Sequence, residues 1–145
     1  MFHAKIKQDI AQVGHTIIGT TDGKRNFLYT VGLTEVGLPE LLVFGMRHDH
    51  GAIILNDAAR IMREKGAFND GDMTDDLANL ITGFKAFSAE QGRNYVVQAI
   101  HYYEGTAKTP RFLQLVIPDR EGRMPGQSNY DEAYMGRYQP LLWEA

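Results

Sequence analysis

The sequence of 145 residues contains no cysteine. This absence excludes disulfides, thiolate nucleophiles, zinc fingers and iron–sulfur clusters. No apolar run approaches the ~20 residues that a membrane-spanning helix needs. The first residues also lack the apolar core, roughly 7–15 residues long, of a secretory signal peptide. We therefore expect a cytoplasmic protein that does not enter the membrane.

An excess of positive charge is also missing, because 15 Lys and Arg residues stand against 18 Asp and Glu, which gives a net charge of −3. The basic residues form no continuous stripe, so binding to DNA or RNA is not expected. The hydrophobic content of 43% and the charged content of 23% are ordinary for a folded domain. The length predicts one domain over 1–145, with a core at about 4–122 and a tail at 123–145.

The N-terminal third predicts a helix followed by a β-hairpin. Apolar residues at helical spacing predict an amphipathic helix over 4–13, which Gly14 ends. Two β-rich runs then flank the dipeptide Asp22-Gly23, which is typical of a tight turn because both residues tolerate positive φ. We expect the strands at about 15–21 and 26–33.

A buried strand and a long helix are expected next. The unbroken apolar run LLVFGM at 41–46 is typical of a central strand that is covered on both faces. Apolar residues at helical spacing predict a helix over about 50–65, capped by Asp49 and ended by Gly66.

The second half of the chain is less regular. The acidic stretch 67–76 predicts a loop, in which Thr74 caps a brief helical segment that carries Leu77, Leu80 and Ile81. Strands are expected at 83–88 and 112–117. Ser88 and Gln91 form a capping box that favours a helix running to about 104, although a strand at 93–104 is the open alternative.

These elements together predict an α+β fold in a single domain. We expect a mainly antiparallel sheet of about five strands, packed with two or three helices. The tail at 123–145 is expected to wrap over the core, anchored by Leu141, Leu142 and Trp143.

Several motifs resemble a bacterial and phage family, domain-of-unknown-function family 4262. The resemblance covers about residues 5 to 142, and its most specific part runs from YTVGL to PEL. The matching segments are FLYTVGL (27–33), G-x-P-E-L (37–41), VFGM (43–46), A-x-x-Y-Y (99–103), LQLVIPDREGRMP (113–125) and QPLL (139–142). Two positions depart from the family pattern, since His15 replaces an aromatic residue and Gly126 a tryptophan. The resemblance implies a shared fold and assigns no activity.

His48-Asp49-His50 is the most metal-like tripeptide. In an extended chain His48 and His50 would point to one side, and His15 or His101 could add a third ligand. A helix that begins at Asp49 would instead splay the two histidines apart. A capped loop with two solvent-exposed histidines is the competing interpretation.

A cluster of tyrosines suggests a ligand pocket. Aromatic walls could hold a planar ligand while the carboxylate of Glu40, expected near a sheet edge or pocket mouth, orients it. The competing interpretation is a core with peripheral tyrosines. The candidate ligand-binding residues are Tyr29, Glu40, Tyr95, His101, Tyr102 and Tyr103.

Three functional hypotheses follow. The first is a small non-enzymatic protein that binds a small molecule or a protein partner, with a phage–host or defence role suggested by the family resemblance. The second is a metal-assisted hydrolase that uses the region of His48 and His50. The third is a homo-oligomeric module, such as a homodimer, that associates through the apolar residues of 141–143. No cofactor is expected.

Overall fold

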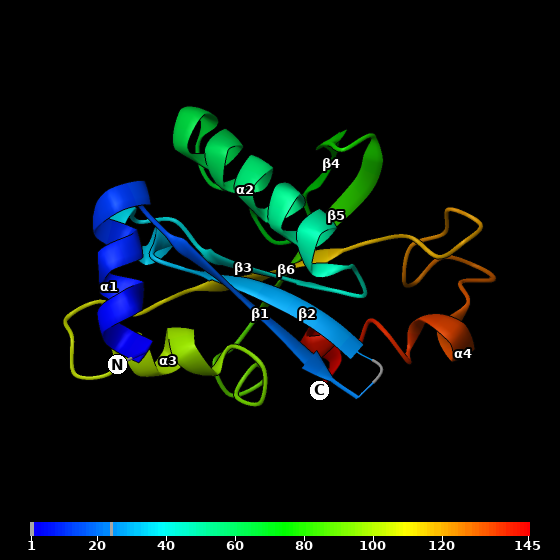
Figure 1. Cartoon of the computed structure of the whole chain (residues 1–145). Helices are drawn as coiled ribbons and strands as arrows, with labels where there is room; N and C mark the ends of the chain where they lie inside the picture. The colour runs from blue at the N-terminus through cyan, green and yellow to red at the C-terminus, as the bar shows by residue number, and fades with distance from the viewer. Residues whose placement is uncertain (1, 24) are drawn as a thin grey trace.

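One six-stranded sheet forms the centre of the molecule, with helices on both of its faces (Figure 1). The computed structural model describes residues 2–23 and 25–145. The strand order is β1-β2-β3-β6-β5-β4, and every neighbouring pair is antiparallel except β3 and β6, which are parallel. The elements are α1 (Phe2–Val13), β1 (Thr16–Asp22), β2 (Arg25–Val31), η1 (Leu33–Val36), β3 (Glu40–Phe44), α2 (His48–Lys65), β4 (Met73–Leu77), β5 (Leu80–Phe87), α3 (Val97–Tyr103), β6 (Phe112–Val116), α4 (Glu132–Met135) and η2 (Leu142–Glu144). The predicted α+β class and the mainly antiparallel sheet are confirmed.

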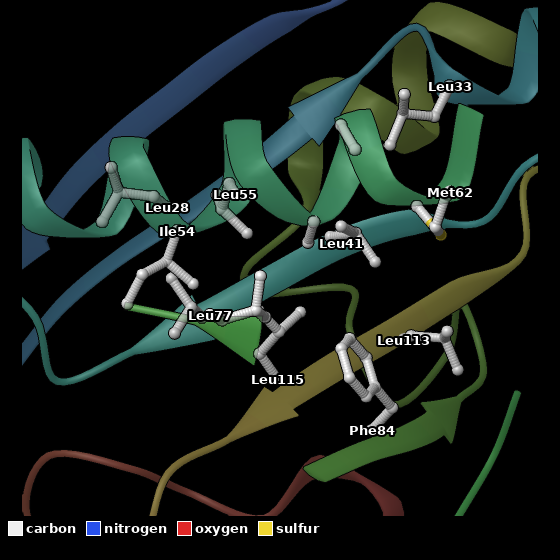
Figure 2. Close-up of a cluster of buried hydrophobic side chains, with 13 residues drawn as sticks. Leu28, Leu33, Leu41, Ile54, Leu55, Met62, Leu77, Phe84, Leu113 and Leu115 are labelled. Carbon is white, nitrogen blue, oxygen red and sulfur yellow. The ribbon is translucent and has the colours of Figure 1, made fainter. Parts of the chain in front are cut away.

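Helix α2 covers one face of the sheet. Its apolar side packs Leu55 and Met62 onto strand residues such as Leu41, and Figure 2 shows these side chains meeting between the helix and the sheet. Gly51 lets the helix approach β2 closely, because a Cβ there would lie 2.5 Å from Cδ1 of Leu28. The hydrophobic stripe seen in the sequence therefore forms this half of the core.

Helices α1 and α3 and the C-terminal segment cover the opposite face (Figure 1). Ile6 of α1, Tyr103 of α3 and Leu142 of η2 are buried there against Leu42 and Phe44 of β3. Successive residues of β3 thus point to opposite layers and are all buried, as the unbroken apolar run predicted. Leu142 is a core residue, so it does not offer the exposed contact expected of a dimer-forming tail.

The N-terminal predictions are confirmed with small shifts. Asp22 pairs with Arg25, so the predicted hairpin between β1 and β2 is present; Lys24 lies outside the described residues. Helix α2 begins at His48, two residues before the predicted start, with Arg47 at its N-cap position. Asp49 is therefore wrong as the N-cap, and its carboxylate accepts a hydrogen bond from the His50 N–H inside the first turn.

The helical segment predicted around Thr74 is wrong. Residues 73–87 form the β4–β5 hairpin, which raises the strand count from five to six. Ala78 and Asn79 both adopt positive φ and make the tight turn, although the pair lacks the glycine that usually marks such a turn. Leu77 and Leu80 pair across the turn and are therefore three positions apart in the sequence. This spacing is the same as that of neighbouring residues on one face of a helix.

The capping box at Ser88 forms as predicted, but the long helix after it does not. The Ser88 N–H donates to Gln91 Oε1 at 2.9 Å, and the Gln91 N–H donates to Ser88 Oγ at 3.0 Å. Turns follow instead of a helix over 89–95, and within them Gly92 packs against the ring of Phe87 at a distance that leaves no room for a Cβ. The helix, α3, starts only at Val97, so the helical alternative is confirmed for 97–103.

The segment after β6 crosses back over the sheet. Gln114, buried in β6, donates to the Pro140 carbonyl at 2.8 Å and accepts from the Leu142 N–H at 3.2 Å. Gln139 bonds both the N–H and the carbonyl of Ile117.

Among the helices of the described residues, none has the length and apolarity that a membrane span requires.

Candidate functional site

The only parallel pair of strands in the described sheet creates a crevice at its carboxyl end. After β3 the chain leaves toward α2 on one face, whereas after β6 it leaves toward the C-terminal segment on the other (Figure 1). Chains that diverge in this way from adjacent parallel strands leave a gap beyond the strand ends, where open sheets commonly bind ligands. Gly45 and Ile117, the residues that directly follow β3 and β6, form the bottom of this gap.

Two grooves share Gly45 and Ile117. The first, the α2 groove, has a volume of about 660 Å³ and lies between the start of α2 and the β4–β5 turn. Its floor is apolar, and Ile53 is 57% exposed although it is aliphatic. Its lining residues are Gly45, Met46, Arg47, His50, Ile53, Ile54, Ala78, Asn79, Leu80 and Ile117.

The second, the α4 groove, has a volume of about 450 Å³ and lies on the other side of the same strand ends. Its walls are more polar and aromatic, and the rings of Tyr134 and Tyr138 lie 5.3 Å apart. Its lining residues are Gly45, Ile117, Pro118, Asp119, Arg120, Tyr134, Met135, Tyr138 and Gln139.

Each groove carries one arginine. Arg47 Nη2 donates to Asp49 Oδ2 at 3.0 Å, and Arg120 Nη2 donates to Asp131 Oδ2 at 3.2 Å. The Arg120 guanidinium also stacks on the ring of Tyr134, with Cζ 3.8 Å from the ring centroid. A guanidinium has five N–H donors, so each arginine keeps donors for a ligand after its aspartate is bound.

Asp119 orders the loop that presents Arg120. Its Oδ1 accepts from the N–H groups of Glu121 and Arg123 at 2.9 and 2.8 Å, and its Oδ2 accepts from the Asp131 N–H at 2.9 Å. Burial opposes ionisation of this carboxyl, but the three backbone donors outweigh it and hold its pKa below the ordinary value. An ionised Asp119 therefore ties both ends of the loop together.

The structure places the predicted tyrosine cluster around α3, away from both grooves. Tyr29 is buried in β2, and its hydroxyl accepts from the Gln98 N–H at 3.0 Å. Tyr95 packs edge-on against the rings of Phe27 and Phe44. These contacts are the ones expected if the tyrosines belong to the periphery of the core.

The three residues at the end of α3 differ in exposure. His101 is exposed and lies 3.7 Å from Glu104, and Tyr102 is half-buried against the ring of Tyr103. Tyr103 is buried, and its pKa is raised by burial and then by the carboxyl of Glu40. A planar-ligand site at this cluster stays a prediction.

Glu40 lies at the start of a central strand and is 1% exposed, so its expected place at a sheet edge or pocket mouth is wrong. Its carboxyl oxygens accept five hydrogen bonds, from the N–H groups of Gly32, Leu33 and Thr34 and the hydroxyls of Thr30 and Thr34, at 2.6–3.3 Å. Burial raises the pKa of Glu40, and these donors act against that rise. The side chain thereby fixes the turn between β2 and η1.

The candidate metal ligands do not come together. His48 turns toward β1, where its Nε2 lies 3.2 Å from the Thr20 carbonyl, whereas His50 lines the α2 groove. His15 bonds Asn56 at 2.9 Å, and His101 lies on α3. Across residues 2–23 and 25–145, no group of three or more His, Asp or Glu side chains could hold a metal ion.

Sequence reasoning missed most of the groove residues. The junction between a central strand and the following helix, at 45–50, was a usable signal, because such junctions commonly bind ligands. For Arg120 and Tyr134 the sequence offers no comparable signal, since these residues reach the site only when the C-terminal segment folds back beside β6.

The fold and the two grooves define a single-domain α+β protein with a crevice at the carboxyl ends of its two parallel strands. The chain belongs to the family of the domain of unknown function DUF4262, whose profile matches residues 9–131. No curated protein and no solved structure matches the chain.

Proposed function

We propose that the protein works by binding a small molecule that carries a phosphate or carboxylate group and an apolar or planar body. The α2 and α4 grooves together would form the site. The observation that carries this proposal is their common base, Gly45 and Ile117, at the carboxyl ends of β3 and β6. We extend the proposal to the cytoplasm of a bacterium, and to a phage–host context, because of the family resemblance.

The charges favour an anion at the mouth of the site. Helix α2 has 18 residues, and its backbone dipoles sum to a partial positive charge at the N-terminus, where the N-cap residue Arg47 makes no side-chain capping bond and Asp49 binds one of the free N–H groups. Arg47 stands at this N-terminus, and Arg120 stands across the shared base. Charge-assisted bonds from these guanidinium groups would orient a phosphate or carboxylate.

The apolar floor favours a body that is not merely an ion. Ile53, Ile54 and Leu80 line the α2 groove, and burying an exposed isoleucine against a ligand gains free energy in proportion to the apolar area removed from water. Tyr134 and Tyr138 offer ring faces in the α4 groove, where a planar group could stack.

Calorimetric titration with three probes tests the proposal: inorganic phosphate, adenosine monophosphate and an aromatic carboxylate such as benzoate. A probe with both an anion and a planar body should bind more tightly than inorganic phosphate. Arg47→Met or Arg120→Met should weaken that binding about tenfold or more. Arg93→Met is the matched control, because Arg93 is also exposed and paired with a nearby acid, Glu90. Absence of binding for all three probes, or an equal loss in the control, would overturn the proposal.

A second pair of variants tests the apolar floor. Ile53→Asp should abolish binding of the aromatic probe. Ile81→Asp should leave it unchanged, because Ile81 is similarly exposed (51%) but lies outside the groove. Equal effects of the two variants would argue against the α2 groove as the site.

A further inference from the structure

The two edges of the sheet are built differently. The β4 edge is poorly suited to bind another strand, because its pairing with β5 is interrupted between Thr74 and Leu77. The interruption exposes Asp75 and Asp76, and charged side chains and irregular pairing both hinder edge-to-edge association. Protection of this kind is ordinary for a monomeric sheet edge.

The β1 edge has no such protection. All seven residues of β1 pair in unbroken register with β2, from Thr16↔Val31 to Asp22↔Arg25. Within the described chain β1 has a strand neighbour on one side only. The run from Thr16 to Thr21 carries neither charge nor proline, and Gly19–Asp22 is exposed. An uncharged, regular edge strand is a template for a further strand.

The hairpin register determines which backbone groups are free. The Asn26 carbonyl accepts from the Gly45 N–H at 2.9 Å, so Asn26 faces β3 and forms a non-hydrogen-bonded pair with Thr21, and such pairs alternate along an antiparallel ladder. The N–H and carbonyl groups of Gly19 and Thr21 therefore point away from β2. These are the groups that an added strand would bind.

We propose that β1 pairs antiparallel with β1 of a second copy of this chain, so that the two sheets become continuous across a two-fold axis at Thr20. In this register Gly19 lies opposite Thr21 of the second copy, and each such pair exchanges N–H···O bonds. The strand is self-complementary there, because uncharged residues meet uncharged residues. This proposal is independent of the ligand grooves.

Charge at the ends of the pairing favours a second copy over an unrelated strand. The register sets Asp22 of one copy opposite Ile18 of the other, and opposed residues point their side chains to the same face. Ile18 lines a groove of about 610 Å³ between α1 and β1, on whose rim the 78% exposed side chain of Lys5 pairs with Asp9 at 3.3 Å. An ammonium group has three N–H donors, so the Lys5 of each copy could bind the approaching Asp22 carboxylate of the other in addition to Asp9.

Analytical ultracentrifugation over a dilution series tests the proposal, with a reversible monomer–dimer equilibrium as the expected result. Thr20→Lys should raise the dimer dissociation constant about fivefold, because the two introduced ammonium groups lie directly opposite each other. Thr20→Asp should act alike for the same reason. A mixture of the Lys and Asp variants should form a heterodimer more readily than either variant forms a homodimer.

Two further variants complete the test. Thr21→Pro removes an outward N–H and leaves the backbone bonds to β2 in place, although it also removes the bond from the Thr21 hydroxyl to Asn26 Oδ1. It should raise the dissociation constant about tenfold. Met73→Lys places the same new charge on an exposed residue of the β4 edge and should change nothing. A wild-type monomer at every concentration, or a dimer equally weakened by Met73→Lys, would overturn the proposal. A lack of preference for the heterodimer in the mixture of Thr20 variants would overturn it too. If the wild type is a monomer at every concentration, the β1 edge would be left to an extended segment of another protein.

Discussion

Thr30 and Glu40 meet in the core between β2 and β3, where the Thr30 hydroxyl donates to Glu40 Oε1 at 2.8 Å. The same hydroxyl accepts a hydrogen bond from the Leu41 N–H at 2.9 Å. Both residues are buried, so neither partner has water as a substitute. The threonine therefore joins the buried carboxyl to the backbone of the strand that carries it.

Replacing this hydroxyl should destabilise the fold. Thr30→Val keeps the shape of the side chain but leaves the Leu41 N–H without its partner and removes one donor from Glu40. We expect a loss of about 2–3 kcal/mol in the free energy of unfolding, measured by urea denaturation. Thr109→Val, at an exposed position outside the helices and strands, is the control and should change stability by less than about 0.5 kcal/mol. Equal losses at the two positions would contradict the role of the Thr30–Glu40 contact.

The raised pKa of Glu40 predicts a pH dependence of known sign. Between the unfolded value of 4.5 and the raised folded value, the folded chain binds more protons than the unfolded chain. The resulting stabilisation is fully present below about pH 4.5 and is lost as the pH rises through the folded pKa. The free energy of unfolding of the wild type, relative to Glu40→Gln, should therefore fall with rising pH in this window. A difference that increases with pH would contradict the prediction.

Asp119 should show the opposite dependence. Its folded pKa lies below the ordinary value of 3.8, so its contribution to stability is present above about pH 3.8. That contribution is lost as the pH falls through the folded pKa. Asp119→Asn should thus be less stable than the wild type at neutral pH, and the difference in unfolding free energy should shrink in acid. A difference that persists at low pH would point to lost packing instead of lost charge.

Alanine substitutions at two glycines distinguish the stability cost of backbone strain from the cost of a steric clash. Gly32 and Gly37 both have positive φ, but only at Gly32 would a Cβ meet other atoms, the closest being the His15 Cα at 2.8 Å. Gly37→Ala should cost about 1 kcal/mol for its backbone conformation alone. Gly32→Ala should cost about 3 kcal/mol or more, because the His15 backbone cannot move aside easily. Thermal and urea unfolding of the two variants would measure this difference, and similar losses would contradict it.

Elements with a long, unambiguous pattern could be predicted from the sequence. Helix α2 was found within two residues because its apolar face repeats over five turns, and β3 because a continuous apolar run requires cover on both faces. The β4–β5 hairpin was missed because Ala78 and Asn79 lack a typical turn signature. Helix α3 is shorter than predicted, since turns replace its first part, and the packing of Gly92 against Phe87 within those turns is not visible in a local pattern.

For Glu40, the sequence showed that a carboxyl precedes a buried strand. That its oxygens are enclosed by the turn at 32–34 required the tertiary structure, since the donors come from a different strand end. The grooves were not predictable for the same reason. Arg47 and Arg120 are 73 positions apart in the sequence, and the parallel pairing of β3 with β6 brings them to one crevice.

By itself the sequence determined the α+β class, the central strand, the main helix and the absence of cysteine chemistry, because these depend on composition and on short-range periodicity. Tertiary structure alone decided which strands are neighbours, which charged groups are buried and which are exposed, and where two grooves share a base. These properties arise from contacts between residues distant in the chain, and their free energies depend on burial and geometry that no local pattern contains.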